Sequence, residues 1–276
     1  MGWWYNLLKS TEGVHFIEYP SNLYVVKKLD TYFHSMLVPK VIHKIIIVDG
    51  GEMPEMPEGM KKALETWYRM NPGYKVKLYS GKDCEAYIRE HYDEETLGAY
   101  RSLKPYSYKC DLMRHLIMYH EGGWYSDIRQ VCLEPLEVLN NLNREYYTSV
   151  DCPPNQMCMY TAFIGSVKEH PISKKMIDLL LWNVKQRHYG LDCLYPTGPG
   201  AYMNAAIDYV RAHPEKCVVG QHTSDEHVVF GGTRILKCKY NSAPGADNSD
   251  LEGTNDYGVM WRQRDVYTND SLSNYY

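Results

Sequence analysis

The segment 106–129 constrains the fold more than any other part of the chain. It combines an apolar helix pattern, a double glycine, a short strand pattern and an acidic residue at its end. Asp111 and Arg114 are three residues apart, so they lie on the same face of the predicted helix. Gly122-Gly123 permits the left-handed backbone that ends a helix. The strand then ends at Asp127, and open α/β sheets bind ligands at the carboxyl ends of their strands. This segment therefore predicts a polar pocket for a phosphorylated or hydroxyl-rich ligand.

Strand and helix patterns alternate along most of the chain. The predicted strands are 41–48, 74–79, 124–126, 130–133, 146–150, 159–165, 217–219, 228–230 and 234–240, and the predicted helices are 60–70, 83–91, 107–120, 171–182 and 199–212. This alternation predicts an α/β fold with a mostly parallel central sheet flanked by helices.

The domain organisation that we expect is simple. Residues 1–37 have no clear periodicity and are interpreted as an N-terminal extension. Residues 38–276 are expected to form a single domain, because a chain of 276 residues is long enough for one sizeable core. The stretch of about 241–258 is rich in Gly, Asp, Asn and Ser and predicts a mobile loop.

The composition argues against several classes of function. Lys and Arg number 30 against 34 Asp and Glu, which gives a formal net charge of −4. A mildly acidic chain without a basic tract is a poor candidate for nucleic-acid binding. No apolar run has the length of a transmembrane segment, and the start of the chain does not resemble a signal peptide. We therefore predict a cytoplasmic location. The eight cysteines form no Cys-x-x-Cys pair and are interpreted as reduced.

Three common catalytic motifs are absent from the sequence. Neither Gly-x-Gly-x-x-Gly nor Gly-x-x-x-x-Gly-Lys-[Ser/Thr] occurs, which argues against a dinucleotide dehydrogenase and against a P-loop enzyme. No Gly-x-Ser-x-Gly nucleophile elbow occurs either.

Six segments, in a fixed order, resemble a known enzyme family. They are VPKVIHKI (38–45), WYRMNPGYKVKLY (67–79), DLMRHLIMYHEGGWYSD (111–127), AFIGS (162–166), HP (170–171) and TGP (197–199). Together they resemble glycosyltransferases of the DXD sugar-binding-region type. That group includes family 32 mannosyl- and galactosyltransferase-like enzymes, capsular polysaccharide synthesis proteins and the glucosylating clostridial toxins. The resemblance covers the segment 38–267.

The resemblance implies a GT-A fold, in which a Rossmann-like nucleotide-binding half merges with an acceptor-binding half. It implies transfer of a sugar from a nucleotide-sugar donor, with a UDP-sugar favoured, to a glycan or glycoconjugate acceptor. It also implies retention of configuration at the sugar and a divalent metal, Mn²⁺ or Mg²⁺. The oligomeric state does not follow from the resemblance.

The resemblance also implies roles for individual residues. The residues beside the nucleobase are His43, Lys44, Ile45 and Ile46. Asp111 and Arg114 lie near the donor sugar and ribose, where the carboxylate accepts hydrogen bonds from sugar hydroxyls and the guanidinium orients it. The alternative for this pair is a plain surface salt bridge. Tyr125 and Asp127 lie at the nucleotide and diphosphate.

The C-terminal part of the chain has weaker candidates. Asn255 and Trp261 occupy the place where relatives close a loop over the donor, with an oxygen ligand and a tryptophan. Trp261 is either a stacking lid or a core anchor. Two loop histidines, His222 and His227, are low-priority metal ligands, because lone loop histidines are usually surface residues.

The chain departs from the family pattern at Asp127-Ile128-Arg129. The family has Asp-x-Asp there, and its second Asp is the usual direct metal ligand. Because Mg²⁺ and Mn²⁺ prefer oxygen ligands, a guanidinium at this position disfavours a site for either ion. Four interpretations remain. Arg129 binds the diphosphate in place of a metal, Asp127 holds a metal with help from elsewhere, catalysis is lost while binding is kept, or Arg129 points into solvent.

Three functions therefore compete. The first is glycosyl transfer, and the second is nucleotide-sugar binding without catalysis, which Arg129 suggests. The third is nucleotidyl transfer, which ranks last because the chain lacks an early Gly-rich phosphate loop that carries Lys or Arg.

Overall fold

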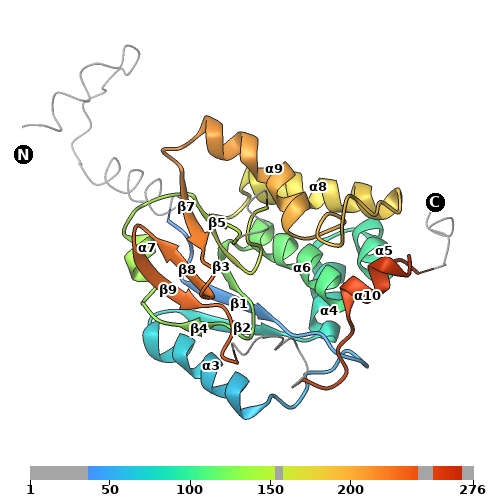
Figure 1. Cartoon of the computed structure of the whole chain (residues 1–276), viewed down its shortest axis with the longest axis horizontal. Helices are drawn as coiled ribbons and strands as arrows, with labels where there is room; N and C mark the ends of the chain where they lie inside the picture. Colours follow the sequence, from blue (N-terminus) through green and yellow to red (C-terminus); the bar gives the residue numbers. More distant parts are fainter. Residues whose placement is uncertain (1–36, 153–157, 242–250, 269–276) are drawn as a thin grey trace, which may run out of the picture. The chain divides into compact units, whose positions relative to one another are not determined.

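The computed structural model describes residues 37–152, 158–241 and 251–268 (Figure 1). The predicted N-terminal extension, apart from its last residue, lies outside the described residues, and so do residues 242–250 of the predicted mobile loop. Within the described part, a nine-stranded sheet is flanked by helices (Figure 1). None of the described helices has both the length and the apolar character that a membrane span requires.

The sheet has the strand order β2-β1-β3-β6-β5-β7-β8-β9-β4. The strands are β1 (Val41–Ile45), β2 (Lys75–Tyr79), β3 (Gly123–Ser126), β4 (Val131–Cys132), β5 (Tyr146–Val150), β6 (Phe163–Ser166), β7 (Cys217–His222), β8 (His227–Phe230) and β9 (Thr233–Lys237). Strand β1 runs parallel to β2 and β3, and β5 runs parallel to β7. The other neighbouring pairs are antiparallel.

The predicted α/β fold class is confirmed, but the sheet is mixed and not mostly parallel. The parallel unit β2-β1-β3 is joined by helical crossovers, as parallel neighbours require. In the C-terminal half, β7, β8 and β9 follow one another through short turns, and such turns can only join antiparallel strands.

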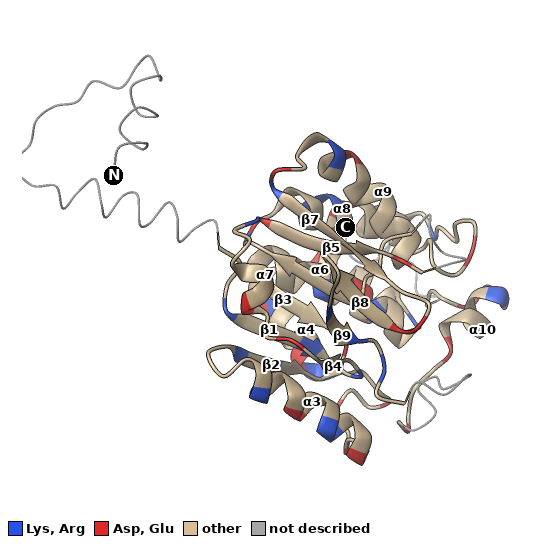
Figure 2. Ribbon diagram, turned by 60° about the vertical axis from the view of Figure 1, so that its left-hand side comes forward, with Lys and Arg blue, Asp and Glu red and all other residues tan. Residues whose placement is uncertain are grey.

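The described helices are α3 (Glu58–Met70), α4 (Gly81–His91), α5 (Glu94–Ser102), α6 (Tyr106–His120), α7 (Glu137–Asn140), α8 (Pro171–Lys185), α9 (Pro199–Ala212) and α10 (Tyr257–Arg262). Helices α5, α7 and α10 were not predicted from the sequence. The first strand was predicted to run to residue 48 but ends at Ile45. Charged residues of both signs are interspersed along α3, as Figure 2 shows, which agrees with the absence of a basic tract.

Two hydrophobic clusters cover the two faces of the sheet. Side chains alternate between the faces of a strand, so Tyr125 of β3 packs in the cluster with α4, α5, α6, α8 and α9. The neighbouring Trp124 packs in the other cluster, together with Trp67 of α3 and Leu139 of α7. Helix α6 is thus held between the sheet and α8, and most of its middle residues are buried.

The double glycine ends α6 as the sequence predicts. Gly122 has φ +68° and Gly123 has φ +100°, and the Gly122 N–H donates to the Met118 carbonyl at 3.1 Å. A Cβ on Gly122 would lie 2.7 Å from the Lys168 backbone nitrogen. Only glycine fits here, because both the left-handed backbone and the close neighbour exclude a side chain.

The strand register brings residues distant in sequence to one edge of the sheet. In the β1–β3 pair, His43 lies opposite Tyr125, so the residues after them, Lys44 and Ser126, emerge together at the carboxyl ends. In the β5–β7 pair, Val150 lies opposite Gln221, so Asp151 and His222 also emerge together. These two parallel pairs build the site described below.

Candidate functional site

Two cavities lie at the carboxyl ends of the parallel strands, with volumes of about 400 Å³ and about 160 Å³. Five residues line both of them: Ser107, Arg114, Asp127, Arg129 and Tyr257. These shared side chains form the boundary between the two cavities. The predicted site residues Asp111, Arg114, Asp127 and Arg129 all line the larger cavity.

Asp111 and Arg114 form a buried pair, not a surface salt bridge. Asp111 Oδ1 lies 3.2 Å from Arg114 Nη2, and both side chains are less than a tenth exposed. The other carboxylate oxygen of Asp111 accepts a hydrogen bond from the Thr197 hydroxyl at 2.8 Å. Burial raises the pKa of Asp111 to about 6, against the opposing effects of Arg114 and Thr197. A carboxyl group with this pKa is close to half-ionised in mildly acidic solution.

Arg114 is held from several sides, yet part of its guanidinium has no partner. Its Nε donates to the Cys110 carbonyl at 3.3 Å, and its Cζ lies 4.6 Å from the centroid of the Tyr125 ring. Its Nη1 is buried and has no hydrogen-bond partner among the described residues. Buried donors are almost always satisfied in folded proteins. Because Arg114 lines both cavities, its guanidinium is a candidate partner for a ligand oxygen.

Asp127 stands at the end of β3 and is fixed by its neighbours. The Tyr125 hydroxyl donates to Asp127 Oδ1 at 2.6 Å. The fully buried Lys44 donates from Nζ to the Ser126 hydroxyl at 2.8 Å and to the Asp127 carbonyl at 3.1 Å. Burial lowers the pKa of Lys44 to about 7. The lysine thus supports the backbone beneath Asp127 and lines neither cavity.

Arg129, which replaces the second aspartate of the family pattern, does not point into solvent. The residue is 7% exposed, lines both cavities, and its Cζ lies 5.4 Å from the centroid of the Tyr240 ring. This placement removes one of the four interpretations left open by the sequence. A buried guanidinium at the boundary of two cavities can offer a bidentate fork to phosphate oxygens.

Of the four residues expected beside a nucleobase, two line the smaller cavity and two do not. Ile45 and Ile46 line the smaller cavity. His43 does not, because its Nδ1 pairs with the Tyr79 hydroxyl at 3.1 Å and its Nε2 pairs with the Gly122 carbonyl at 2.9 Å. Burial lowers the pKa of His43 to about 4, so this histidine is neutral. His43 and Lys44 thus stabilise the strand ends, and only the two isoleucines reach the cavity.

The C-terminal candidates have structural partners. Asn255 Oδ1 accepts from the Tyr106 N–H at 2.9 Å, which satisfies a free donor at the start of α6, and Nδ2 donates to the Lys104 carbonyl at 3.1 Å. Trp261 donates from Nε1 to the Tyr189 carbonyl at 2.7 Å and lines neither cavity. Of the two interpretations of Trp261, the core anchor matches its position.

Tyr257 is the aromatic residue of this segment that reaches the site, and it was not predicted. It begins α10, lines both cavities, and its ring centroid lies 5.9 Å from that of Tyr108. The Asp256 side chain caps the same helix by accepting from the Val259 N–H at 2.8 Å. A capping aspartate before a short helix pattern was a signal that could have placed Tyr257 at a helix start.

DXD-type glycosyltransferases commonly use a divalent metal, but the described residues around Asp127 do not fit Mn²⁺ or Mg²⁺. Arg129 stands where the second carboxylate would be, and the Asn255 oxygen already accepts a backbone hydrogen bond. Arg114 Nη2 also lies 3.7 Å from Asp127 Oδ1. Hard cations need several oxygen ligands, and a corner with one carboxylate and two guanidinium groups does not supply them.

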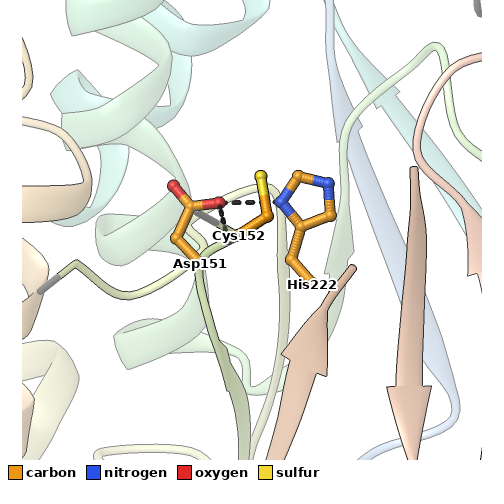
Figure 3. Close-up of side chains that lie close together, drawn as sticks. All are labelled: Asp151, Cys152 and His222. Atoms are coloured by element: carbon orange, nitrogen blue, oxygen red, sulfur yellow. Dashed lines mark hydrogen bonds and ion pairs between the residues drawn. The ribbon is translucent and has the colours of Figure 1, made fainter. Parts of the chain in front are cut away.

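A second group of polar side chains also lines the larger cavity, and Figure 3 shows three of them, Asp151, Cys152 and His222. His222 Nδ1 pairs with Asp151 Oδ1 at 2.7 Å, and Cys152 lies next to both. His222 was expected in a loop and was ranked low, because lone loop histidines are usually surface residues, but it is buried at the end of β7. Nothing in its local sequence pattern shows that Asp151 would lie beside it. His227, the other histidine considered, lines neither cavity.

The sequence of this chain matches a family model of glycosyltransferases. Residues 57–148 match the family model described as "Glycosyltransferase sugar-binding region containing DXD motif". This match confirms the resemblance inferred from the sequence.

Curated proteins with similar sequences are also glycosyltransferases. An initiation-specific alpha-1,6-mannosyltransferase of Candida albicans is 27% identical over 214 residues, which cover 65% of this chain and 55% of that protein. Inositol phosphoceramide mannosyltransferase 2 of Schizosaccharomyces pombe is 26% identical over 165 residues, which cover 59% of this chain and 44% of that protein. The chain thus spans about half the length of the curated relatives it matches.

Among solved structures, the PaToxG glycosyltransferase is similar, with a TM-score of 0.47 and 17% identity. The match covers 69% of this chain and 79% of that one.

Proposed function

On the premise that residues 57–148 are a glycosyltransferase sugar-binding region of the DXD type, we propose that this chain transfers a sugar from a nucleoside-diphosphate sugar to a glycan or glycoconjugate acceptor. The fold that we propose for the transfer domain is GT-A, and the transfer is proposed to retain configuration. The mixed α/β sheet, with its cavities at the carboxyl ends of β1, β3 and β5, supports this proposal.

The buried Asp111–Arg114 pair is the observation that carries the proposal. Both charges line the larger cavity, and Arg114 Nη1 has no partner among the residues that the structure describes. Isolating two charges from water is costly unless a ligand or a partner compensates them. A sugar ring offers hydroxyl groups that can donate to Asp111 and accept from Arg114, so this pair suits the donor sugar.

The leaving diphosphate would be stabilised by fixed positive charge. A nucleoside diphosphate gains negative charge as the sugar departs, and preorganised donors at that place stabilise the transition state. Arg129 and Arg114 line the boundary of the two cavities and can both reach a ligand there. We propose that Arg129 supplies part of this positive charge, because it stands at the position of the second aspartate in the family pattern and lines both cavities.

The smaller cavity is proposed to hold the nucleobase. Ile45 and Ile46 supply an apolar wall, and Tyr257 supplies an aromatic ring at its boundary. A flat base between an apolar wall and an aromatic ring buries its faces while its polar edge remains free for hydrogen bonds. The identity of the base does not follow from these contacts, and both UDP- and GDP-sugars are candidates.

Mannose is the first sugar to test, because both curated relatives described above are named as mannosyltransferases. Binding without catalysis is the second candidate function. The observation that favours it is Arg129, which stands at the position of a catalytic metal ligand in the family pattern.

A ligand panel followed by a turnover assay tests the proposal. Thermal unfolding is measured with UDP-glucose, UDP-galactose, GDP-mannose, dTDP-glucose and CMP-sialic acid, each with EDTA or Mn²⁺. A ligand that binds the native state raises its apparent stability by about 2.7 kcal/mol at a hundred times its Kd. We expect one nucleoside diphosphate sugar to stabilise the protein and to be hydrolysed slowly without acceptor.

The outcomes separate the candidates. Stabilisation without donor hydrolysis, with or without an acceptor glycan, would identify a binding protein. If none of the sugars stabilised the protein and none were hydrolysed, the proposed function would be wrong.

A further inference from the structure

Five side chains of metal-ligating type gather on one wall of the larger cavity: Asp151, Cys152, His222, Glu226 and Cys238. The ligand atoms of Asp151, Cys152 and His222 all lie within 4.8 Å of one another. The same holds for His222, Glu226 and Cys238. His222 is common to both groups, so all five residues surround one imidazole.

The sheet itself brings these residues together. Strands β5 and β7 are parallel neighbours with Val150 opposite Gln221, which places Asp151 beside His222. Strands β8 and β9 are antiparallel, and just beyond their pairing the Cys238 N–H donates to the Glu226 carbonyl at 2.8 Å. The five residues therefore lie at the ends of four strands. Pairing between the strands, and not loop conformation alone, determines their positions.

His222 is oriented in the way that metal-binding histidines are. Its Nδ1 pairs with Asp151 Oδ1 at 2.7 Å, and the Cys152 N–H donates to the same oxygen at 2.8 Å (Figure 3). Its Nε2 is buried and has no hydrogen-bond partner in the described part of the chain. A ligating histidine almost always donates its other ring N–H to a carboxylate or carbonyl, which fixes the tautomer. Asp151 thus leaves the lone pair of Nε2 free for a cation.

We propose that His222, Glu226 and Cys238 bind one zinc-class divalent cation, with Asp151 behind His222 as a positioning residue. An imidazole, a carboxylate and a thiolate are ligands of the kind that Zn²⁺ prefers, and three protein ligands leave a fourth position open. Thiolate ligands do not suit Mg²⁺ or Mn²⁺. The site is therefore chemically distinct from the hard-cation site of the family pattern, which the residues around Asp127 do not fit.

The bound ion would have two effects. It would tie together the ends of β7, β8 and β9. It would also add positive charge to the cavity that Asp127 and Arg129 line. This inference goes beyond the proposed sugar transfer and does not depend on it.

A cobalt titration tests the site on the full chain without an affinity tag. The protein is stripped with a chelator, kept reduced with a phosphine and titrated with Co²⁺, which reports thiolate ligands by a charge-transfer band in the near ultraviolet. Equilibrium dialysis with Zn²⁺ followed by elemental analysis measures the stoichiometry and the Kd. We expect one equivalent of Zn²⁺, and loss of the cobalt band when Zn²⁺ is added.

Variants decide whether these residues form the site. His222→Ala and Cys238→Ser should abolish the stoichiometric binding and the cobalt band. Asp151→Asn should keep the band but weaken binding about 10- to 100-fold, as loss of an orienting partner does. Cys193→Ser and His227→Ala are matched controls, since Cys193 lines the same cavity outside both groups and His227 lies nearby on β8. Both controls should bind like the wild type.

Two results would overturn the inference. One is the absence of a cobalt band with no stoichiometric zinc in the reduced wild-type protein. The other is equal binding in His222→Ala, Cys238→Ser and the controls, which would indicate an adventitious ion only. If His222→Ala does not fold, Glu226→Gln and Asp151→Asn provide the same comparison. The metal titration uses no nucleotide sugar. A negative zinc result therefore does not contradict the proposed sugar transfer, and a negative transfer assay does not contradict the zinc site.

Discussion

The guanidinium of Arg114 lies between two carboxylates, 3.2 Å from Asp111 and 3.7 Å from Asp127. The two carboxylates differ in exposure, because the Asp111 side chain is 9% exposed and the Asp127 side chain is 42% exposed. One buried cation thus connects a carboxylate inside the larger cavity with one at the boundary of the two cavities. A change to any of the three charges is therefore felt by the other two.

Asp111→Asn should abolish sugar transfer with little effect on folding. The amide keeps the shape of the side chain and can still accept from Thr197, but it removes the charge that pairs with Arg114. We expect kcat/KM to fall by about a hundredfold or more, which corresponds to roughly 3 kcal/mol of transition-state stabilisation. Donor turnover and thermal unfolding of the variant check this. Turnover close to that of the wild type would make Asp111 a structural residue only.

The activity should rise with pH through about 6, because Asp111 must be ionised to accept from sugar hydroxyls and burial raises its pKa to about 6. A profile of kcat/KM between about pH 5 and pH 8 should show this acidic limb in the wild type. Asp111→Glu, which keeps a titratable carboxyl, serves as the comparison. A flat wild-type profile would contradict the assignment.

Stability should change in the opposite direction to activity. The folded-state pKa of Asp111, about 6, lies above its ordinary value of 3.8, so the native state binds more protons between these pH values. The contribution of Asp111 to the free energy of unfolding is therefore fully present below about pH 4 and is lost as the pH rises through about 6. Denaturant unfolding of wild type and Asp111→Asn should show a difference that varies by about 2–3 kcal/mol over this range. A difference that is constant with pH would contradict this.

Arg129 should take over the role of a metal at the diphosphate. If so, donor turnover persists in excess EDTA, and Arg129→Asp loses most of its turnover in EDTA. Arg129→Lys should retain part of the turnover, since it keeps the charge but loses the bidentate fork. Turnover that EDTA abolishes, together with an Arg129→Asp variant of normal or higher activity with Mn²⁺, would show that the arginine has no such role.

Tyr257 and Trp261 should respond differently to substitution although both lie on α10. Tyr257 lines both cavities, so Tyr257→Ala should raise the KM for the donor. Trp261→Phe loses the hydrogen bond to the Tyr189 carbonyl and should lower the free energy of unfolding by about 1 kcal/mol without changing that KM. Kinetics and denaturant unfolding of both variants give the comparison. The reverse pattern would restore Trp261 as the lid over the donor.

Gly165→Ala should destabilise the sheet, because an added Cβ would lie 2.5 Å from the ring of the buried Trp124. Overpacking of a well-packed core costs about 1–3 kcal/mol. Gly73→Ala is the matched control, since nothing lies within 4 Å of its added Cβ. Its free energy of unfolding should equal or slightly exceed that of the wild type. Equal stability of the two variants would mean that Trp124 can move to accommodate the methyl group.

Local patterns in the sequence predicted the parts of the structure that depend on neighbouring residues. Asp111 and Arg114 share a face of α6 because they are three residues apart, and Gly122-Gly123 ends that helix because of its backbone freedom. The alternation of helices and strands also predicted the α/β class. Helices α5, α7 and α10 were missed because they are short, and short helices depend on tertiary packing more than on their own sequence.

Strand order and register decided what the sequence left open. His43 could not be separated from Ile45 and Ile46 by pattern, yet its ring turns to Tyr79 and Gly122 while the isoleucines reach the cavity. Asp151 and His222 are far apart in sequence, and only the parallel pairing of β5 with β7 makes them neighbours. Helix periodicity and glycine turns arise from interactions within a few residues, which the amino-acid order specifies directly. Contacts across a sheet depend on which strands pair and in which register, and that is decided only when the whole core is packed.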